Sequence, residues 1–149
     1  MTDHFAATCA MSVKTGLTVA LHGQLGAGKT RFVKAFCAGL GINPTEVTSP
    51  TFVLMQQYRG PRWPVCHFDT YRLADKDEFL ALGAEELLLD PEQICLVEWA
   101  DRVAEIIPND HLLVKIEHTG PTDRQFDLTS FGSVSDGLLE RVRRKLETP

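Results

Sequence analysis

GQLGAGKT, the stretch from Gly23 to Thr30, decides the fold class of this chain. It matches the pattern G-x-x-x-x-G-K-[ST], in which glycines let the backbone turn tightly and direct several N–H groups toward phosphate oxygens. The lysine of this pattern reaches the β- and γ-phosphates, and the hydroxyl that follows it binds Mg²⁺. The stretch therefore predicts a site for ATP and Mg²⁺, with Thr30 on the metal. Its predicted residues are Gly23, Leu25, Gly26, Ala27, Gly28, Lys29 and Thr30.

The sequence on either side of this loop has the local structure that the pattern requires. The apolar run from Leu17 to Leu21 predicts a buried strand that ends at the loop. Residues from Lys29 to Leu40 carry apolar side chains at helical spacing, and Gly41 is typical of a helix end. The free N–H groups and the dipole of that helix would face an anion bound in the loop. The alternative, a glycine-rich turn with an incidental lysine, does not account for this context.

Further strands and helices follow along the chain. Apolar runs predict strands at Thr51–Tyr58, Val65–Asp69, Ile94–Val97, Leu112–Ile116 and Gln125–Leu128. Helices are expected within Asp77–Leu89, interrupted near Gly83, and over Ser133–Leu146, where Ser133 and Asp136 resemble a capping box. Continuously apolar strands are typical of a parallel sheet that is covered on both faces. We therefore expect a three-layer α/β domain of the P-loop NTPase type, with a mainly parallel central sheet and antiparallel edge strands.

Length and composition set limits on the function. The 149 residues suit a single domain, 1–149. Lys and Arg number 15 against 20 Asp and Glu, and the net charge of −5 argues against the whole molecule acting as an electrostatic clamp on nucleic acid. The four cysteines form no C-x-x-C pair, so no zinc or redox motif is expected. Without a signal peptide or an apolar run near 18 residues, we expect a cytoplasmic protein with no membrane partner.

Two acidic residues follow apolar strands and are candidates for the metal side of the site. Asp69 comes after Val65–Phe68, and Glu98 comes after Ile94–Val97. A carboxylate at the end of a neighbouring strand commonly helps to hold Mg²⁺ beside a P-loop. Ligands in open α/β sheets also collect outside the carboxyl ends of the strands. The residues alone leave open which acid contacts the metal and which orients the attacking water.

Other residues admit both a structural and a functional interpretation. Thr51 by itself fits a loop-to-strand turn, although its hydroxyl also suits a switch loop that senses the γ-phosphate. His67 by itself fits a hydrogen-bonded structural histidine, and Trp99 fits either the core or a surface that packs against a base or a partner. The basic run near the C-terminus fits the favourable end of a helix dipole better than an RNA contact. That run comprises Arg141, Arg143, Arg144 and Lys145.

Taken together, four motifs resemble the TsaE family, formerly called YjeE. They are GQLGAGKT, TSPTF (Thr48–Phe52), HFDTYRL (His67–Leu73) and LVEW (Leu96–Trp99), in this order and spacing. The resemblance extends from about Gly16 to about Asp127, most of the chain. It implies the P-loop ATPase of tRNA threonylcarbamoyladenosine biosynthesis, with weak, partner-dependent ATP hydrolysis. It also implies a partnership with the subunits of the threonylcarbamoyl-transferase complex, which the nucleotide cycle resets between turnovers, and only indirect involvement of tRNA.

The resemblance also implies roles for individual residues. Lys29, Asp69 and Glu98 form the expected catalytic set, with Glu98 as the Mg²⁺-linked acid. Thr51 becomes the switch threonine, in place of the turn that its local sequence favours. The nucleotide-binding residues extend to Thr51, Trp99 and Arg124. The chain departs from the family pattern at Gln24, at Arg31 and in residues 1–16, which form a shortened N-terminal segment.

Two other functions remain as alternatives at the level of sequence. A P-loop small-molecule kinase would need an acceptor pocket and usually an arginine-rich lid, whereas the arginines here are scattered. A nucleotide-gated binding module would bind ATP with negligible catalysis. Glu98 followed by Trp99 suits hydrolysis or switching better than phosphate transfer to a small acceptor.

Overall fold

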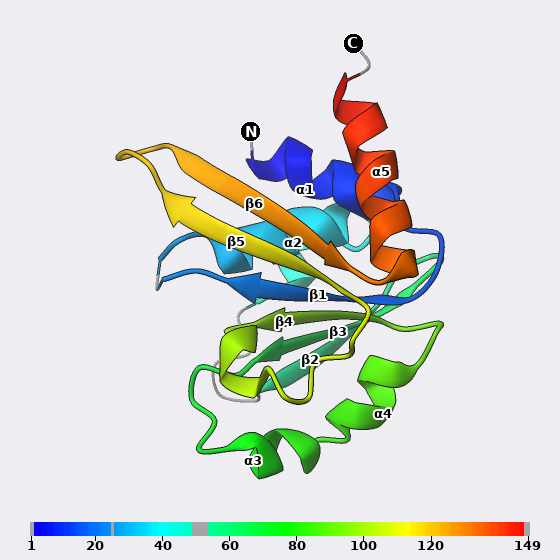
Figure 1. Cartoon of the computed structure of the whole chain (residues 1–149), viewed down its shortest axis with the longest axis vertical. Coiled ribbons are helices and arrows are strands. Elements are labelled where there is room, and N and C mark those ends of the chain that lie inside the picture. The colour runs from blue at the N-terminus through cyan, green and yellow to red at the C-terminus, as the bar shows by residue number, and fades with distance from the viewer. Residues whose placement is uncertain (1, 25, 49–53, 148–149) are drawn as a thin grey trace.

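The apolar runs form the central strands of a twisted sheet (Figure 1). The computed structural model describes residues 2–24, 26–48 and 54–147. Strands β1 (Leu17–His22), β3 (Pro64–Asp69) and β4 (Ile94–Glu98) are buried along almost their whole length. β1 lies between β4 and β5 (His111–His118) and is parallel to both, and β3 is parallel to β4. Strands covered on both faces cannot alternate apolar and polar residues, which explains their continuous apolar sequences.

Antiparallel strands close both edges of this sheet. Within the described residues, the strand order is β2-β3-β4-β1-β5-β6, with β2 (Met55–Arg59) antiparallel to β3 and β6 (Arg124–Phe131) antiparallel to β5. The predicted fold class is therefore confirmed. The strand predicted from Thr51 begins at Met55, preceded by Leu54 at φ 65°, and residues 51–53 lie outside the described part of the chain.

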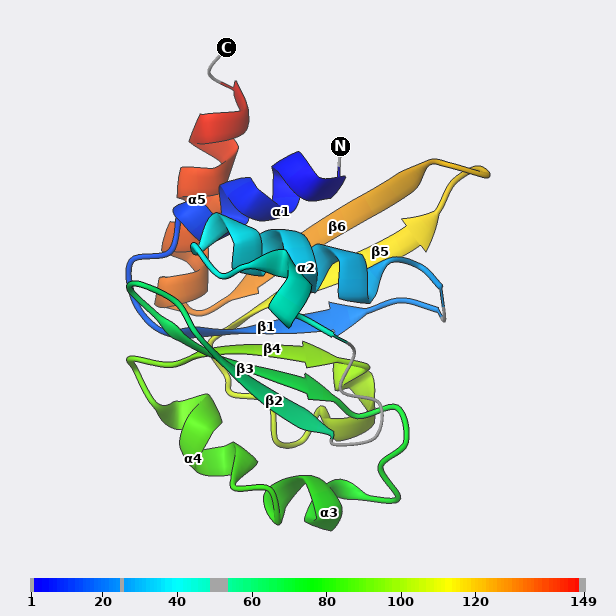
Figure 2. The ribbon, with the colours of Figure 1, turned by 180° about the vertical axis from the view of Figure 1, so that it is seen from behind.

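Helices cover the sheet on both faces. α1 (Thr2–Met11), α2 (Lys29–Gly39) and α5 (Ser133–Glu147) share a hydrophobic cluster with one face. The shorter α3 (Lys76–Leu80) and α4 (Ala84–Leu89) pack against the other (Figures 1 and 2). Short 3₁₀ turns, η1 (Pro44–Glu46) and η2 (Ala100–Val103), follow α2 and β4. No helix of the described residues is long and apolar enough to span a bilayer.

Helix α1 was not expected from the sequence, and it packs closely against α2. A Cβ atom added to Gly39 would lie 2.9 Å from both the Cβ of Ala10 and the Cα of Ala7, so only glycine permits this approach. Arg141 of α5 donates to the carbonyl of Ser12 at 2.8 Å, and Lys145 donates to that of Met11 at 3.0 Å. Arg141 and Lys145 of the basic run therefore satisfy carbonyl groups at the end of a different helix, in addition to any effect on the dipole of α5.

The N-terminus of α5 is capped by Asp110, so the predicted capping box of Ser133 and Asp136 is wrong. The carboxylate of Asp110 accepts from the N–H groups of Val134 at 2.9 Å and Ser135 at 3.0 Å, whereas Asp136 accepts from the hydroxyl of Ser130. A capping group can thus come from a distant loop, because any acceptor placed at the first turn satisfies its free N–H groups.

We predict that Asp110→Ala lowers the free energy of unfolding by about 1–2 kcal/mol, the usual contribution of a helix cap. The melting temperature would fall by roughly 2–8 °C, and thermal unfolding followed by circular dichroism measures it. Asp127→Ala, which removes an exposed acid on β6, is the matched control. Equal melting temperatures for the two variants would contradict this assignment.

The same cap predicts a pH dependence. Burial of Asp110 opposes its ionisation, but hydrogen bonds from Ser135 and Val134 and the charge of His111 outweigh burial and lower its pKa. The stabilisation is therefore complete above the unfolded pKa of about 3.9 and is lost as the pH falls through the lower folded pKa. The difference in stability between the unsubstituted chain and Asp110→Ala should shrink over that acidic range.

Candidate nucleotide site

Strand register brings the predicted site residues to one edge of the sheet. Glu98 at the end of β4 is paired with Asp69 at the end of β3 on one side and with Leu21 of β1 on the other. β1 leads directly into the glycine-rich loop. Because these strands are parallel, their carboxyl ends open on the same side, where ligands of α/β sheets bind.

The loop between β1 and α2 has the backbone conformation of an anion-binding turn. Gly26 and Gly28 have φ values of 81° and 108°, in the left-handed region that favours glycine. Gly28 is the N-cap of α2, and no side chain there accepts a hydrogen bond from the first turn. A helix N-terminus that has no side-chain cap from its N-cap residue is suited to bind an anion. Leu25 of this loop and Thr51 lie outside the described residues.

Lys29 folds back onto the loop. Its ammonium donates to the carbonyl groups of Gly23 at 2.6 Å and Gln24 at 2.9 Å and lies 4.0 Å from the ring centroid of Trp99. The residue is 5% exposed, and this burial lowers the pKa of the ammonium, while the charges of Glu98, Asp69 and Asp101 act in the opposite direction. A buried cation held by neutral carbonyl groups is suited to exchange them for charged phosphate oxygens, which bind it more strongly.

The ring of Trp99 packs against the ammonium of Lys29. Trp99 has φ 59°, an uncommon left-handed conformation for a non-glycine residue, and its ring centroid lies 4.8 Å from that of Tyr71. Lys29 approaches within the range of cation–π attraction. Trp99 is therefore in contact with Lys29 of the P-loop, and its packing against a base or a partner stays a prediction.

We predict that the fluorescence of Trp99 reports nucleotide binding. If Lys29 leaves the ring for the phosphates, the charge nearest the indole changes, and the emission should change in proportion to the bound fraction. The chain has two tryptophans, so Trp63→Phe, a substitution in the turn before β3, isolates the signal. Emission that stays constant while calorimetry shows saturation would contradict this prediction.

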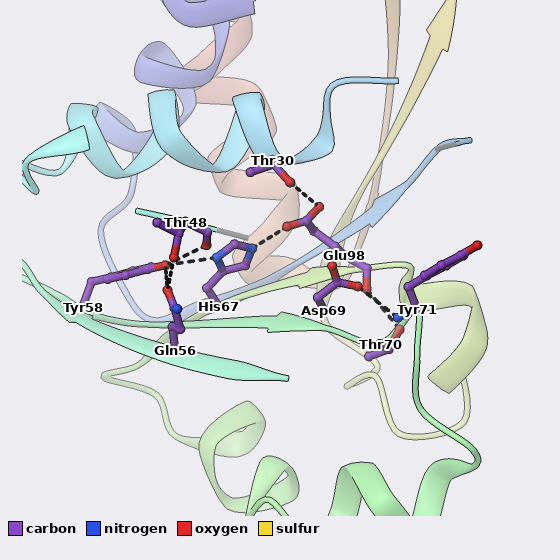
Figure 3. A network of polar contacts seen from close by, with 9 residues as sticks. All are labelled: Thr30, Thr48, Gln56, Tyr58, His67, Asp69, Thr70, Tyr71 and Glu98. Atoms are coloured by element: carbon purple, nitrogen blue, oxygen red, sulfur yellow. Dashed lines mark hydrogen bonds and ion pairs between the residues drawn. The ribbon is translucent and has the colours of Figure 1, made fainter. Parts of the chain in front are cut away.

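Glu98 lies at the centre of the acidic side of the site (Figure 3). It is 2% exposed; its Oε1 accepts from the hydroxyl of Thr30 at 3.0 Å, and its Oε2 lies 2.5 Å from Nε2 of His67. Asp69, 7% exposed, accepts from the N–H of Tyr71 at 3.0 Å. The hydroxyl of Thr70 bonds to the carbonyl groups of Glu98 and Trp99 and ties β3 to the end of β4.

Several cavities adjoin the described part of the loop; the one lined by Gly23, Gln24, Ala27, Trp99 and residues of β5, about 530 Å³ in volume, includes neither Thr30 nor Glu98. A second, of about 480 Å³, is lined by Gly26, Gly28, Lys29, Thr30, Arg31, Asp69, Tyr71, Arg72, Glu98 and Trp99. Another, of about 540 Å³, lies toward the turn between β5 and β6, where the Nε of Arg124 donates to the carbonyl of Ala27 at 3.0 Å. Arg31, one of the departures from the family pattern, lines these last two cavities and pairs with Asp3 of α1 at 3.1 Å.

The oxygen groups that line the cavity of about 480 Å³ fit Mg²⁺. This ion prefers oxygen ligands, keeps several waters and is commonly held by one or two carboxylates together with phosphate oxygens. The hydroxyl of Thr30 and the carboxylate of Glu98 already contact each other. Across the described ranges 2–24, 26–48 and 54–147, no group of three or more His, Cys, Asp or Glu is placed to hold a metal by itself. A site completed by a nucleotide is consistent with both observations.

His67 is a site residue whose contact with Glu98 was not anticipated. Side chains two apart on a strand point to the same face, so His67 and Asp69 of β3 face the same side. This alternation of side chains along the strand is the sequence feature that indicates that His67 lies on the same face as Asp69. The contact itself depends on the register of β3 against β4, which the sequence does not state.

Comparison with known proteins identifies the family. The family model described as "Threonylcarbamoyl adenosine biosynthesis protein TsaE" matches residues 1–126. The Bacillus subtilis "tRNA threonylcarbamoyladenosine biosynthesis protein TsaE" is 37% identical over 143 residues, covering 96% of this chain and 88% of that protein. The Treponema pallidum protein of the same name is 39% identical over 113 residues, with coverages of 76% and 82%.

A solved structure shows the same arrangement. The crystal structure of Bacillus subtilis YdiB matches this fold with a TM-score of 0.77 at 32% identity, covering 98% of this chain and 89% of that one. Fold, motif order and family model thus agree over most of the chain. On this evidence, the chain belongs to the TsaE family.

Proposed function

We propose that this chain binds ATP with Mg²⁺ and hydrolyses it weakly, as an accessory protein in the biosynthesis of tRNA threonylcarbamoyladenosine. The observation that carries the proposal is the hydrogen bond between Thr30 of the P-loop helix and Glu98 at the end of β4. It joins the expected metal-binding hydroxyl to an acid from another strand. The family model and the names of the curated relatives support the tRNA-modification role.

The proposed phosphate site lies in the cavity of about 480 Å³. Loop N–H groups from Gly23 to Gly28, with Leu25 among them, and the first turn of α2 bind the phosphate oxygens, and Lys29 exchanges its loop carbonyls for the β- and γ-phosphates. Thr30 and Glu98 would hold Mg²⁺. The ion, when bound, neutralises the charge that develops on the phosphates.

We assign Asp69 to the orientation of the attacking water. It is paired with Glu98 across the sheet but, unlike Glu98, is not the residue that accepts from Thr30. Its position in the lining of the same cavity supports a role for this second carboxylate beside the γ-phosphate. Thr51 is proposed as the switch threonine on the strength of the family motif alone.

The nucleoside is proposed to occupy the cavity of about 540 Å³. The cavity adjoins the loop at Ala27 and Gly28, and its wall includes Thr2 of α1, Arg124 and Phe126. Arg124 already bonds to the loop, so it links the nucleoside side of the site to the phosphate side. Trp99 contributes from the phosphate side, through Lys29.

The proposed partners are the subunits of the threonylcarbamoyl-transferase complex, and tRNA is involved only through them. A phosphate-release assay with and without that complex tests the function. We expect slow release by the chain alone and faster release with the complex. Release only on addition of a small acceptor would support the kinase alternative, and ATP binding without release under any condition would support the binding module. Either result would overturn the proposal.

A further inference from the structure

A row of hydrogen-bonding side chains, buried from Glu98 through His67 to Tyr58, runs away from the P-loop (Figure 3). His67 lies in the middle of the row and is fully buried. Its Nε2 contacts Glu98, and its Nδ1 lies 3.4 Å from the hydroxyl of Tyr58. Tyr58 in turn donates to Oε1 of Gln56 at 2.6 Å and lies 3.3 Å from the carbonyl of Thr48. The row therefore links Glu98 to β2 and to Thr48, the last described residue before 49–53.

The ring nitrogen of His67 that faces Glu98 acts as a hydrogen-bond donor. An ionised carboxylate only accepts hydrogen bonds, so Nε2 of His67 carries a proton toward Oε2. Thr30 supplies the other donor, to Oε1. Both oxygens of Glu98 therefore have a hydrogen-bond donor. Oε1 accepts from Thr30, which would bind the metal, and Oε2 accepts from His67, which would not. Within the described part of the chain, loss of His67 would leave this almost fully buried carboxylate with Thr30 as its one side-chain donor.

The second ring nitrogen of His67 is held as well. With the ring proton on Nε2, Nδ1 is an acceptor, so the hydroxyl of Tyr58 faces it as a donor that is shared with the closer Oε1 of Gln56. The hydroxyl of Thr48 also donates to Oε1 of Gln56, at 3.1 Å. These contacts limit rotation of the ring, and a ring that cannot rotate keeps its Nε2 directed at Glu98.

We infer that His67 is a positioning residue, which holds Oε2 of Glu98 so that Oε1 stays directed toward Thr30 and the metal. This inference rests on the proposed function of Glu98. Groups that orient a metal-linked side chain commonly change metal affinity or activity by about 10- to 100-fold when removed. Among the described residues, His67 does not line the cavity in which the phosphates are proposed to bind, and its hydrogen-bonding contacts are with Glu98 and Tyr58.

The test compares His67→Leu with His67→Gln. Leucine removes the donor, whereas the glutamine amide places an N–H near the position of Nε2. Calorimetry measures ATP binding with and without Mg²⁺. We expect His67→Leu to raise the Mg²⁺ concentration needed for half-maximal enhancement of ATP binding by about 10- to 100-fold, with Mg²⁺-free ATP binding unchanged and with substantial recovery in His67→Gln. His111→Gln, at a histidine bonded to Pro108 outside the site, is the matched control.

Glu98→Gln separates this inference from the proposed function. If Glu98→Gln does not change the Mg²⁺ dependence, the assigned role of Glu98 is wrong and the inference falls with it. If Glu98→Gln changes the dependence but His67→Leu matches the unsubstituted chain, the inference alone is wrong. In the Glu98→Gln background, replacement of His67 should have little further effect, because the residue is proposed to act through that carboxylate.

A spectroscopic readout and a milder variant keep the inference testable if His67→Leu does not fold. A proton held between a ring nitrogen and a carboxylate resonates far downfield in ¹H NMR, and we expect such a signal without nucleotide or metal. It should be absent from His67→Gln and Glu98→Gln and retained in His111→Gln. Tyr58→Phe keeps the ring of His67 and removes the contact to Nδ1, so we expect a smaller shift of the Mg²⁺ dependence in the same direction. No downfield signal together with an unshifted Tyr58→Phe would overturn the inference.

Discussion

Lys29→Ala is expected to abolish measurable ATP binding. The ammonium is the point charge that the P-loop directs at the β- and γ-phosphates, and it is almost fully buried. Removing one partner of a buried, hydrogen-bonded charge pair costs about 2–5 kcal/mol, which corresponds to roughly 30- to 4,000-fold in affinity. Isothermal titration calorimetry with ATP and Mg²⁺ measures the effect, and the emission change of Trp99 should be lost with it.

Lys34→Ala provides the matched control for this prediction. Lys34 lies on the same helix and carries the same charge, but it is exposed. Its removal tests whether general loss of positive charge weakens binding. An ATP affinity for Lys29→Ala equal to that of Lys34→Ala would contradict the assignment of the P-loop as the phosphate site. Melting temperatures of both variants show whether α2 still packs.

Glu98→Gln is expected to reduce ATP hydrolysis far more than ATP binding. Glutamine has the size of glutamate and can still accept from Thr30, but it lacks the charge that faces the metal. Loss of one group that stabilises a transition state commonly lowers kcat by about 10²–10³-fold. The loop N–H groups and Lys29 should still bind the phosphates, so ATP binding should fall much less. Single-turnover phosphate release and calorimetry measure the two effects separately.

The comparison with an acid outside the site makes this second prediction specific. Glu105 pairs with Lys76 at the surface, so Glu105→Gln removes the same charge without touching Thr30. We expect Glu105→Gln to match the unsubstituted chain in both assays. Equal losses of binding and hydrolysis in Glu98→Gln would contradict this prediction and show that the charge of Glu98 acts on nucleotide binding as much as on the transition state. Unchanged hydrolysis would contradict its place in the site.

The two predictions also relate Asp69 to Glu98. The pairing of β3 with β4 places the two carboxylates side by side, so removal of either changes the electrostatic potential in the same cavity. Glu98 alone of the two is the acceptor for Thr30. Their roles therefore differ by position even though both follow apolar strands, and that difference lies beyond what the strand pattern predicts.

The sequence by itself determined the features that depend on neighbouring residues. The loop from Gly23 to Thr30, the strand before it and the helix after it form one short-range unit, which the spacing of glycines and apolar residues describes completely. Asp69 and Glu98 could also be predicted at one edge of the sheet, because parallel strands end on the same side. The family motifs also predict a switch role for Thr51, which lies outside the described residues, so that role stays a prediction.

The tertiary structure decided the features that depend on residues far apart in the chain. Asp110 rather than Ser133 caps α5, since the loop before β5 reaches the first turn of that helix. The contact of His67 with Glu98 depends on the register of two strands and on burial. Local sequence describes which conformation a segment prefers, but which polar groups meet in the interior is set by packing, because every buried donor and acceptor needs a partner there.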